Sequence, residues 1–340
     1  MTLAALRRQS DWLARDLRTF PDVLAPQIEQ LALSSSPKSC VAVGSGDSHF
    51  AAMAATYGWR LLTGMTLAVQ SPQTLLYADT GPDDLLVATS ASGTSPATIA
   101  AMRSAAAGMK IAITCNTGTP LAAAADGVLE LCLPSNEPSP GVRTYHASLV
   151  AHLYLALAIG RAHGALTASD FADRFARMIE LAERIETTVS SLAQPCQHLA
   201  RRIAGSAVIG IIGGGPNLGT AHFVAAKLTE AAGQLAFGRD VEEWWHVERF
   251  AQPRSSPLVV LAPAGKSHAR ALEVAAEARD LGHHVVLVAD PAVENRGIAE
   301  DFLAIPDANS EWLSPLLHGL FAPMLAAELA QTMGRVPFGR

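Results

Sequence analysis

An internal repeat limits the fold of this chain more than any other feature of its sequence. Each half contains a short apolar strand, a Gly-rich turn and a long Ala-rich helix, in that order. These segments occupy residues 39–43, 44–48 and 49–62 in the first half, and 206–212, 213–215 and 220–233 in the second. A repeat of this length predicts two similar structural units that each bury their own core.

The strands that follow alternate with helices in both halves. They are predicted at residues 67–70, 84–90, 110–114 and 128–131, and then at 258–262 and 284–289. Alternating strands and helices form parallel sheets that are covered on both faces and joined by right-handed crossovers. The predicted fold is therefore α/β, with two tandem doubly wound parallel sheets, each a three-layer α/β/α sandwich.

The boundary between the two domains is predicted near residue 185. Residues 168–200 show helical periodicity without a strand signal, so they are interpreted as a linker helix. The predicted domains then span residues 1–185 and 186–340. The chain length of 340 residues agrees with this division, because a typical domain has about 150 residues.

Charge and hydropathy exclude several kinds of partner. The formal net charge is -6 and no run of Lys or Arg could follow a nucleic-acid backbone, so nucleic acid is not expected as a ligand. Apolar stretches such as 153–159 and 207–212 are shorter than the roughly 20 residues of a membrane span, and no apolar signal core follows Arg8. A cytoplasmic protein without a membrane partner is expected. No Cys-x-x-Cys pair or His/Cys/Asp cluster has metal-ligand spacing, so no metal or other cofactor is expected.

The strongest local motif is Thr89-Ser90-Ala91-Ser92-Gly93-Thr94-Ser95-Pro96, directly after the apolar run 85–88. Ser95 fits the N-cap position and Pro96 the first helical position, so the free amides of the next helix face the loop. An anion is favoured there, in the strand-end crevice where doubly wound sheets bind ligands. The simpler interpretation is a Ser/Thr-rich turn that only caps its helix. Five hydroxyls in seven positions are more than capping requires.

The turn 44–48 repeats this geometry at the end of the preceding strand and offers the hydroxyl of Ser48. It does not match a dinucleotide-binding fingerprint, because His49 stands where a small residue is required. The segment 264–267 resembles the end of a P-loop, but Val260 stands at the leading glycine position. We therefore do not expect a nucleotide, whereas a phosphate on a small molecule is compatible with both loops.

These residues resemble the sugar isomerase (SIS) domain family over nearly the whole chain. The resemblance rests on the leading segment 19–24, Gly46-Asp47-Ser48, Ser90-Ala91-Ser92-Gly93-Thr94-Ser95, Lys227-Leu228-Thr229-Glu230 and Glu243-Trp244-Trp245-His246. The duplicated arrangement is similar to the isomerase domains of the amino-sugar synthases and to stand-alone phosphosugar deaminases and isomerases. The loop 263–268 has lost most of its hydroxyls, which predicts one phosphate site per chain, in the first half.

The resemblance implies roles for particular residues. It implies a phosphate site formed by Ser48, Ser90, Ala91, Ser92 and Ser95. It also implies that the backbone near Val142 touches the sugar.

Two further residues are implied to carry the chemistry. The resemblance makes Glu230 the base that moves a proton between C1 and C2, and His246 the group that helps to open the sugar ring. An aldose/ketose shift needs a carboxylate beside a carbon acid and an imidazole that can donate near neutral pH. Taken singly, Glu230 would be a solvated helix residue and His246 a packed or surface histidine. In the family this histidine reaches the neighbouring subunit's pocket, which implies a homodimer with shared active sites.

Three features depart from the family's pattern. Asp47 replaces a hydroxyl residue beside the phosphate, so its charge must point away or change what the pocket accepts. Trp244 and Trp245 are expected to make the approach to His246 bulkier. The tail 334–340 contains no lysine, whereas the synthases have one there that forms an imine with the open sugar. Imine chemistry with a protein lysine is therefore not expected.

The predicted function is a phosphosugar aldose/ketose isomerase, or a deaminase or deglycase acting on an amino-sugar phosphate or a fructosamine phosphate. No glutaminase domain is expected, because Met1-Thr2-Leu3 leads directly into the first sugar domain. The alternative is a sugar-phosphate sensor that regulates a partner without turnover. The 38 residues before the first strand are too few for the DNA-binding domain of such regulators, which favours the enzyme.

Overall fold

The computed structural model describes residues 2–31, 33, 37–134, 137–295 and 297–339, which form two compact units. The first-sheet unit comprises Arg15–Asn136 and Arg143–Ala182. The second-sheet unit comprises Met1–Ala14, Glu137–Val142 and Glu183–Arg340. Two long helices, α1 (Leu3–Gln30) and α6 (Ala168–Ser191), contribute residues to both units.

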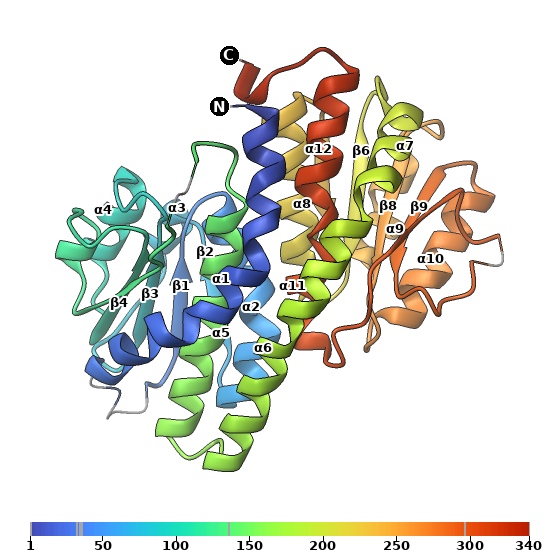
Figure 1. The fold of residues 1–340 in the computed structure, drawn as a ribbon. Coiled ribbons are helices and arrows are strands. Elements are labelled where there is room, and N and C mark those ends of the chain that lie inside the picture. The colour runs from blue at the N-terminus through green and yellow to red at the C-terminus, as the bar shows by residue number, and fades with distance from the viewer. Residues whose placement is uncertain (1, 32, 34–36, 135–136, 296, 340) are drawn as a thin grey trace. The chain divides into compact units, whose positions relative to one another are not determined.

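The first sheet has five parallel strands in the order β2-β1-β3-β4-β5 (Figure 1). They are β1 (Cys40–Val43), β2 (Leu67–Gln70), β3 (Leu85–Thr89), β4 (Met109–Thr114) and β5 (Gly127–Glu130). β1 and β3 are buried along their whole length, as expected for the central strands of a parallel sheet with helices on both faces.

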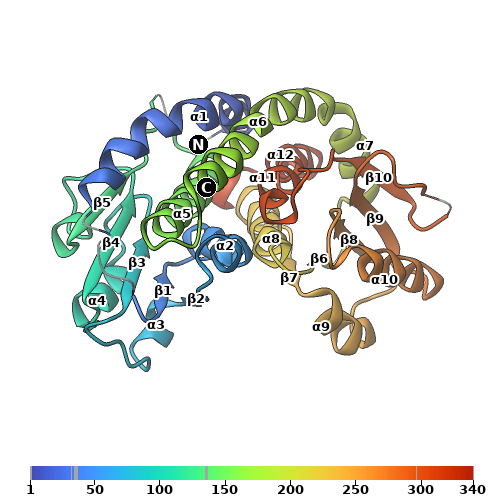
Figure 2. The same ribbon diagram turned by 90° about the horizontal axis from the view of Figure 1, so that it is seen from below.

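Helices cover both faces of the first sheet, as Figure 2 shows. They are α2 (Asp47–Thr63), α3 (Pro72–Leu75), α4 (Pro96–Ser104) and α5 (Arg143–Ala162), with a short 3₁₀ turn, η1 (Ala122–Ala124). α2 and α5 cover one face, and α3 and α4 cover the other (Figure 2). A buried apolar cluster that includes Val41, Leu86, Ile99 and Met102 joins the sheet to α4.

The second sheet repeats the topology of the first. Its parallel strands are β6 (Ile209–Gly213), β7 (Ala236–Arg239), β8 (Pro257–Ala262), β9 (His284–Ala289) and β10 (Asp301–Ala304). The order β10-β9-β8-β6-β7 becomes 2-1-3-4-5 when the strands are numbered within the sheet, as in the first sheet. The predicted fold class, two tandem doubly wound parallel sheets, is therefore confirmed.

The helices of the second-sheet unit also lie on both faces of their sheet (Figure 2). They are α7 (Ala193–Ile203), α8 (Asn217–Ala232), α9 (Val241–His246), α10 (His268–Asp280), α11 (Pro315–His318) and α12 (Phe321–Thr332), with 3₁₀ turns η2 (Glu248–Phe250), η3 (Glu311–Leu313) and η4 (Pro337–Gly339). A buried cluster that includes Trp244, Val260, Val274 and Leu287 joins β8 and β9 to α9 and α10.

Several element boundaries differ from the predicted ones. The sequence did not predict β7 and β10, because each has only one buried residue of four and so lacks a continuous apolar run. The predicted linker helix 168–200 is two helices, α6 and α7, separated at Leu192. α2 begins at Asp47 rather than His49, which places Ser48 in the first turn of the helix.

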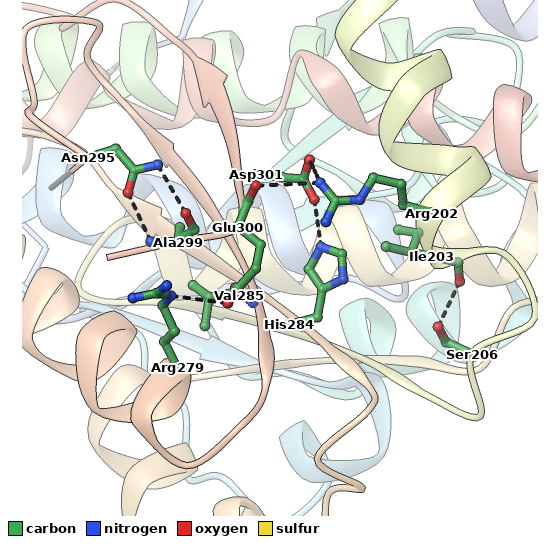
Figure 3. Close-up of polar contacts among 10 residues, drawn as sticks. All are labelled: Arg202, Ile203, Ser206, Arg279, His284, Val285, Asn295, Ala299, Glu300 and Asp301. Carbon is green, nitrogen blue, oxygen red and sulfur yellow. Dashed lines mark hydrogen bonds and ion pairs between the residues drawn. The ribbon is translucent and has the colours of Figure 1, made fainter. Parts of the chain in front are cut away.

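Polar side chains hold β10 at the edge of the second sheet (Figure 3). Asp301 accepts hydrogen bonds from Arg202 Nη1 at 2.6 Å and pairs with His284 Nε2 at 2.5 Å. The neighbouring Glu300 accepts from the amide of Val285 at 2.7 Å and from Arg279 Nε at 3.1 Å. These contacts hold β10 in the sheet, although the strand buries little apolar surface of its own.

One segment, Glu311–Thr332, is long and apolar enough to cross a membrane by length and composition. The apolar stretches predicted from the sequence did not include it. In the structure it is divided into η3, α11 and α12, and 89% of its most apolar window is buried inside the protein. α12 packs on α7 and α8, so we interpret the segment as part of the core.

Candidate active site

The turns that follow β1 and β3 meet at the carboxyl edge of the first sheet. The strand register places Val43 beside Ala88, and a Cβ added to Gly44 would lie 3.1 Å from the carbonyl oxygen of Thr89. β2 lies on one side of β1 and β3 on the other, so the order of the strands reverses at this point. In doubly wound sheets this position forms a ligand-binding crevice.

Backbone hydrogen bonds fix the loop from Ser90 to Ser95 at its start and at Gly93. The amide of Ser90 donates to the carbonyl of Ile113 at 3.0 Å, and the amide of Gly93 donates to the carbonyl of Ser90 at 2.9 Å. Gly93 has a φ of 65°, and a Cβ at this position would lie 2.3 Å from Thr119 Oγ1. Gly93 is therefore required both for its backbone conformation and for the close approach of Thr119.

α4 begins directly after this loop and has no side-chain cap. Ser95 occupies the N-cap position and Pro96 the first turn, as predicted, but the hydroxyl of Ser95 accepts from Thr98 Oγ1 at 3.1 Å instead of capping an amide. Ser92 is exposed, and its hydroxyl accepts from the amide of Thr94 at 3.3 Å. The positive end of the α4 dipole, with its first backbone amides, thus lies next to several hydroxyl groups. This is a suitable environment for a phosphate.

Ser48 is half-buried in the first turn of α2, at the same edge of the sheet. Asp47 is the first residue of this helix, and its Oδ1 atom is buried. A negative side chain in the first turn stabilises the helix. Asp47 therefore has a local structural role at the start of α2. The sequence alone did not show whether its charge has such a role or changes what the pocket accepts.

A buried pair lies directly beneath the loop. Thr89 Oγ1, at the end of β3, lies 3.0 Å from His152 Nε2 of α5. His152 is fully buried, and burial lowers its pKa from 6.5 to about 4. The imidazole is therefore neutral near neutral pH and joins α5 to the strand that carries the loop.

Glu230 lies on α8 in the second-sheet unit, with 32% of its side chain exposed. Its Oε2 atom lies 2.6 Å from Nζ of Lys227, which is fully buried. A buried ammonium in contact with a carboxylate restricts that carboxylate's orientation. Lys227 was not predicted as a site residue, although its spacing of three positions from Glu230 puts both on one helix face.

His246 is the last residue of α9, and 72% of its side chain is exposed. Its Nε2 atom lies 3.6 Å from Glu242 Oε2. A hydrogen bond from the guanidinium of Arg270 is the main cause that lowers the pKa of Glu242. An anionic partner therefore stands one helical turn from His246.

The expectation that Trp244 obstructs the approach to His246 is wrong. Trp244 is fully buried in the core of the second-sheet unit, and its Nε1 donates to Gln252 Oε1 at 2.7 Å. Trp245 is only partly buried and lies under the guanidinium of Arg249, 4.0 Å from the ring centroid. Of these two tryptophans, Trp245 is the one with an exposed surface beside the histidine.

Val142 is buried immediately before α5, and its amide donates to Gln9 Oε1 at 3.3 Å. A contact with a sugar would therefore have to come from another atom of this residue. The structure brings Ser48, Ser90, Ala91, Ser92 and Ser95 to one edge of the first sheet. Val142, Glu230 and His246 belong to the second-sheet unit.

The family model described as "SIS domain" matches residues 33–158, which contain the first sheet and its loops. This segment is an SIS domain. The resemblance inferred from the hydroxyl-rich loop is therefore confirmed for the part of the chain that contains that loop.

A curated relative matches a longer part of this chain. The glutamine–fructose-6-phosphate aminotransferase (isomerizing) of Zymomonas mobilis is 27% identical over 324 residues, covering 91% of this chain and 51% of the relative. The chain thus spans about half the length of the curated relatives that it matches.

Solved structures match both sheets of this chain. The C-terminal domain of glucosamine-fructose-6-phosphate aminotransferase from Francisella tularensis superposes with a TM-score of 0.84, at 18% identity, covering 97% of this chain and 98% of that one. Tagatose-6-phosphate ketose/aldose isomerase from Escherichia coli gives 0.75 at 19% identity, covering 99% and 94%. Glucosamine-6-phosphate deaminase from Thermotoga maritima gives 0.72 at 15% identity, covering 98% and 96%. At these identities the likeness shows the shared fold.

Proposed function

We propose that this SIS protein is a cytoplasmic enzyme that isomerises or deaminates a sugar phosphate. The observation that carries the proposal is the uncapped start of α4 within a hydroxyl-rich loop, at the strand-end crevice of an SIS domain. Ser48, Ser90, Ser92 and Ser95 would donate hydrogen bonds to the phosphate. The names of the relatives, which include a ketose/aldose isomerase and a deaminase of sugar phosphates, support this substrate class.

Isomerisation and deamination of a 2-amino sugar share a proton transfer between C1 and C2. In our proposal Glu230 takes the proton from one carbon and returns it to the other. Lys227 acts as a positioning residue, because its buried ammonium holds one carboxylate oxygen and leaves the other oriented for the transfer. Neither role requires a metal ion.

His246 would assist the opening of the sugar ring by donating a proton to the ring oxygen. Its high exposure in the single chain agrees with a role in the pocket of a second subunit. The residues that follow it expose apolar surface, with Val247 55% and Phe250 74% exposed. We therefore propose a homodimer in which this segment is covered and the active sites are shared.

Turnover by the parent and by a Glu230→Gln variant tests the proposed function. The substrates are glucosamine 6-phosphate, fructose 6-phosphate, tagatose 6-phosphate and a fructosamine 6-phosphate. For each substrate we would measure isomerisation, release of ammonia or amino acid, and thermal stabilisation of the protein. Glu230→Gln keeps the shape of the side chain but removes the base, so we expect turnover to fall about 100-fold or more with little change in binding.

Glu273→Gln is the matched control, because Glu273 is an exposed glutamate of α10 that pairs with Arg270. It should leave turnover unchanged. Binding of a sugar phosphate by the parent without any turnover would favour the sensor instead. Normal turnover in Glu230→Gln would remove Glu230 from the mechanism.

A further inference from the structure

The strand order of the second sheet reverses at the ends of its first and third strands, as in the first sheet, and we call this place the second-sheet crevice. Its first and third strands, β6 and β8, are neighbours, and their register places Gly213 beside Leu261. The turn after β6 and the loop after β8 touch, since a Cβ added to Gly214 would lie 2.6 Å from Cβ of Ser267. Because both sheets have the same strand order, this is the second place where the topology favours a ligand.

Two long helices begin at this crevice without side-chain caps. α8 follows the turn after β6, and α10 follows the loop after β8. Ser267 has the N-cap position of α10 that Ser95 has in α4. The Oγ atom of Ser267 is buried and has no hydrogen-bond partner among the described residues. The crevice therefore combines two positive helix ends with an unused hydroxyl donor.

A side chain of the same unit lies at this crevice. Glu311, the first residue of η3, accepts a hydrogen bond from the backbone amide of Lys266 to its Oε1 atom at 3.0 Å. A Cβ added to Gly265 would lie 2.3 Å from Cδ of Glu311, and one added to Gly215 would lie 4.0 Å from its Oε1. The carboxylate is thus in contact with the loop after β8 and close to the turn after β6.

The position of the carboxylate is fixed through its own backbone. The carbonyl of Glu311 accepts from Ser314 Oγ at 2.7 Å, and Ser314 Oγ in turn accepts from Asn217 Nδ2 at 2.6 Å. Asn217 is the first residue of α8 and is fully buried. η3 is therefore attached to the helix that forms one wall of the crevice.

We propose that the second-sheet crevice is an anion-binding site whose ligand is the chain's own Glu311. The carboxylate occupies the place of a phosphate, so the second sheet is closed to phosphorylated ligands while Glu311 is present. Removal of this side chain would convert the crevice into a site for inorganic phosphate or a phosphate monoester. This inference concerns only the second-sheet unit and does not depend on the function proposed for the first.

The test counts the inorganic phosphate bound per chain by equilibrium dialysis, for the parent and for Glu311→Ala. We expect Glu311→Ala to bind about one phosphate more than the parent, since the crevice retains its amides and the Ser267 hydroxyl. Glu311→Gln is the matched control, because its amide has the same size and keeps an acceptor for Lys266. It should show no gain.

Adding Ser92→Ala and Ser95→Ala to each chain separates the two sheets. These changes should lower phosphate binding by the parent but leave the gain from Glu311→Ala intact. A folded Glu311→Ala chain without additional phosphate would overturn the proposal, whatever the first loop binds. If Glu311→Ala does not fold, Glu311→Ser gives the same comparison. Failure of both to fold would identify the carboxylate as a structural tie and would equally overturn the proposal.

Discussion

Two fully buried histidines, His152 and His318, make the stability of this protein sensitive to acid. Burial is the largest cause that lowers the pKa of each from 6.5 to about 4. His152 contacts Thr89 beneath the loop, and His318 Nδ1 lies 3.2 Å from the carbonyl oxygen of Ser314. His152 lies in the first-sheet unit and His318 in the second-sheet unit, and both imidazoles are neutral in the folded state near neutral pH.

We expect the free energy of unfolding to fall as the pH is lowered from 7 to 5. Between pH 6.5 and 4 the unfolded chain binds protons at these histidines and the folded chain does not, so acid favours unfolding. Each histidine should contribute about 2 kcal/mol of this loss by pH 5. Urea titrations at pH 7 and 5 measure the loss, which should be smaller in His152→Gln and in His318→Gln. An equal loss in the parent and in both variants would contradict this account.

Single residues show what the sequence could and could not predict about the site. The placement of Ser90, Ser92 and Ser95 between a buried strand and a helix was predictable, because they directly follow an apolar run and precede Pro96. The role of Lys227 could not be predicted, because nothing in the sequence shows that its ammonium group is buried against Glu230. The environment of Trp244 depends on Gln252 and the core of its unit, which only the folded chain brings together.

At the level of secondary-structure elements, a buried ion pair joins α1 to the start of α5. The guanidinium of Arg143 donates to both carboxylate oxygens of Asp16, from Nε at 2.7 Å and from Nη2 at 2.8 Å. A third nitrogen, Nη1, donates to the carbonyl of Pro134 at 2.8 Å. Both side chains are almost completely buried. This contact fixes the first turn of the helix that also carries His152.

Asp16→Ala should therefore be strongly destabilising. It leaves the guanidinium of Arg143 buried without its carboxylate partner, which typically costs about 3 to 5 kcal/mol. Asp173→Ala is the control, because Asp173 forms an exposed pair with Arg177 that should contribute less than about 0.5 kcal/mol. Urea unfolding at pH 7 measures both changes. A loss in Asp16→Ala no greater than that in Asp173→Ala would show that the buried pair does not hold α5.

The central strands of both sheets could be predicted from the sequence, whereas the edge strands of the second sheet, β7 and β10, could not. β3, β4, β8 and β9 are apolar runs that stand out against their surroundings. β10 depends on side-chain contacts of Asp301 and Glu300 with residues distant in the sequence (Figure 3). The contact between Glu311 and the amide of Lys266 was also beyond prediction, since 45 residues separate the two.

At the level of the whole molecule, the proposed homodimer makes a prediction about mixed subunits. If each site takes Glu230 from one chain and His246 from the other, a dimer of one Glu230→Gln chain and one His246→Ala chain has one intact site. Random pairing gives half mixed dimers, so about a quarter of the parent's activity should return after the two variants are unfolded, mixed and refolded. Each variant refolded alone is the control. Inactivity of a demonstrated mixed dimer would show that the sites are not shared.

The central claim is that the loop from Ser90 to Ser95 binds the phosphate of a sugar phosphate. The most direct test is calorimetric titration of four proteins: the parent, Ser92→Ala, Ser95→Ala and the control Ser104→Ala. Each is titrated with the sugar phosphate that stabilises the parent most, and then with the corresponding sugar without phosphate. Ser104 is the last residue of α4, at the far end from the loop. Each loop hydroxyl should contribute about 1.5 to 3 kcal/mol to binding, so each loop variant should bind roughly tenfold to hundredfold more weakly while Ser104→Ala binds normally. Undiminished affinity in both loop variants, or equal affinity of the parent for the sugar without phosphate, would contradict the claim.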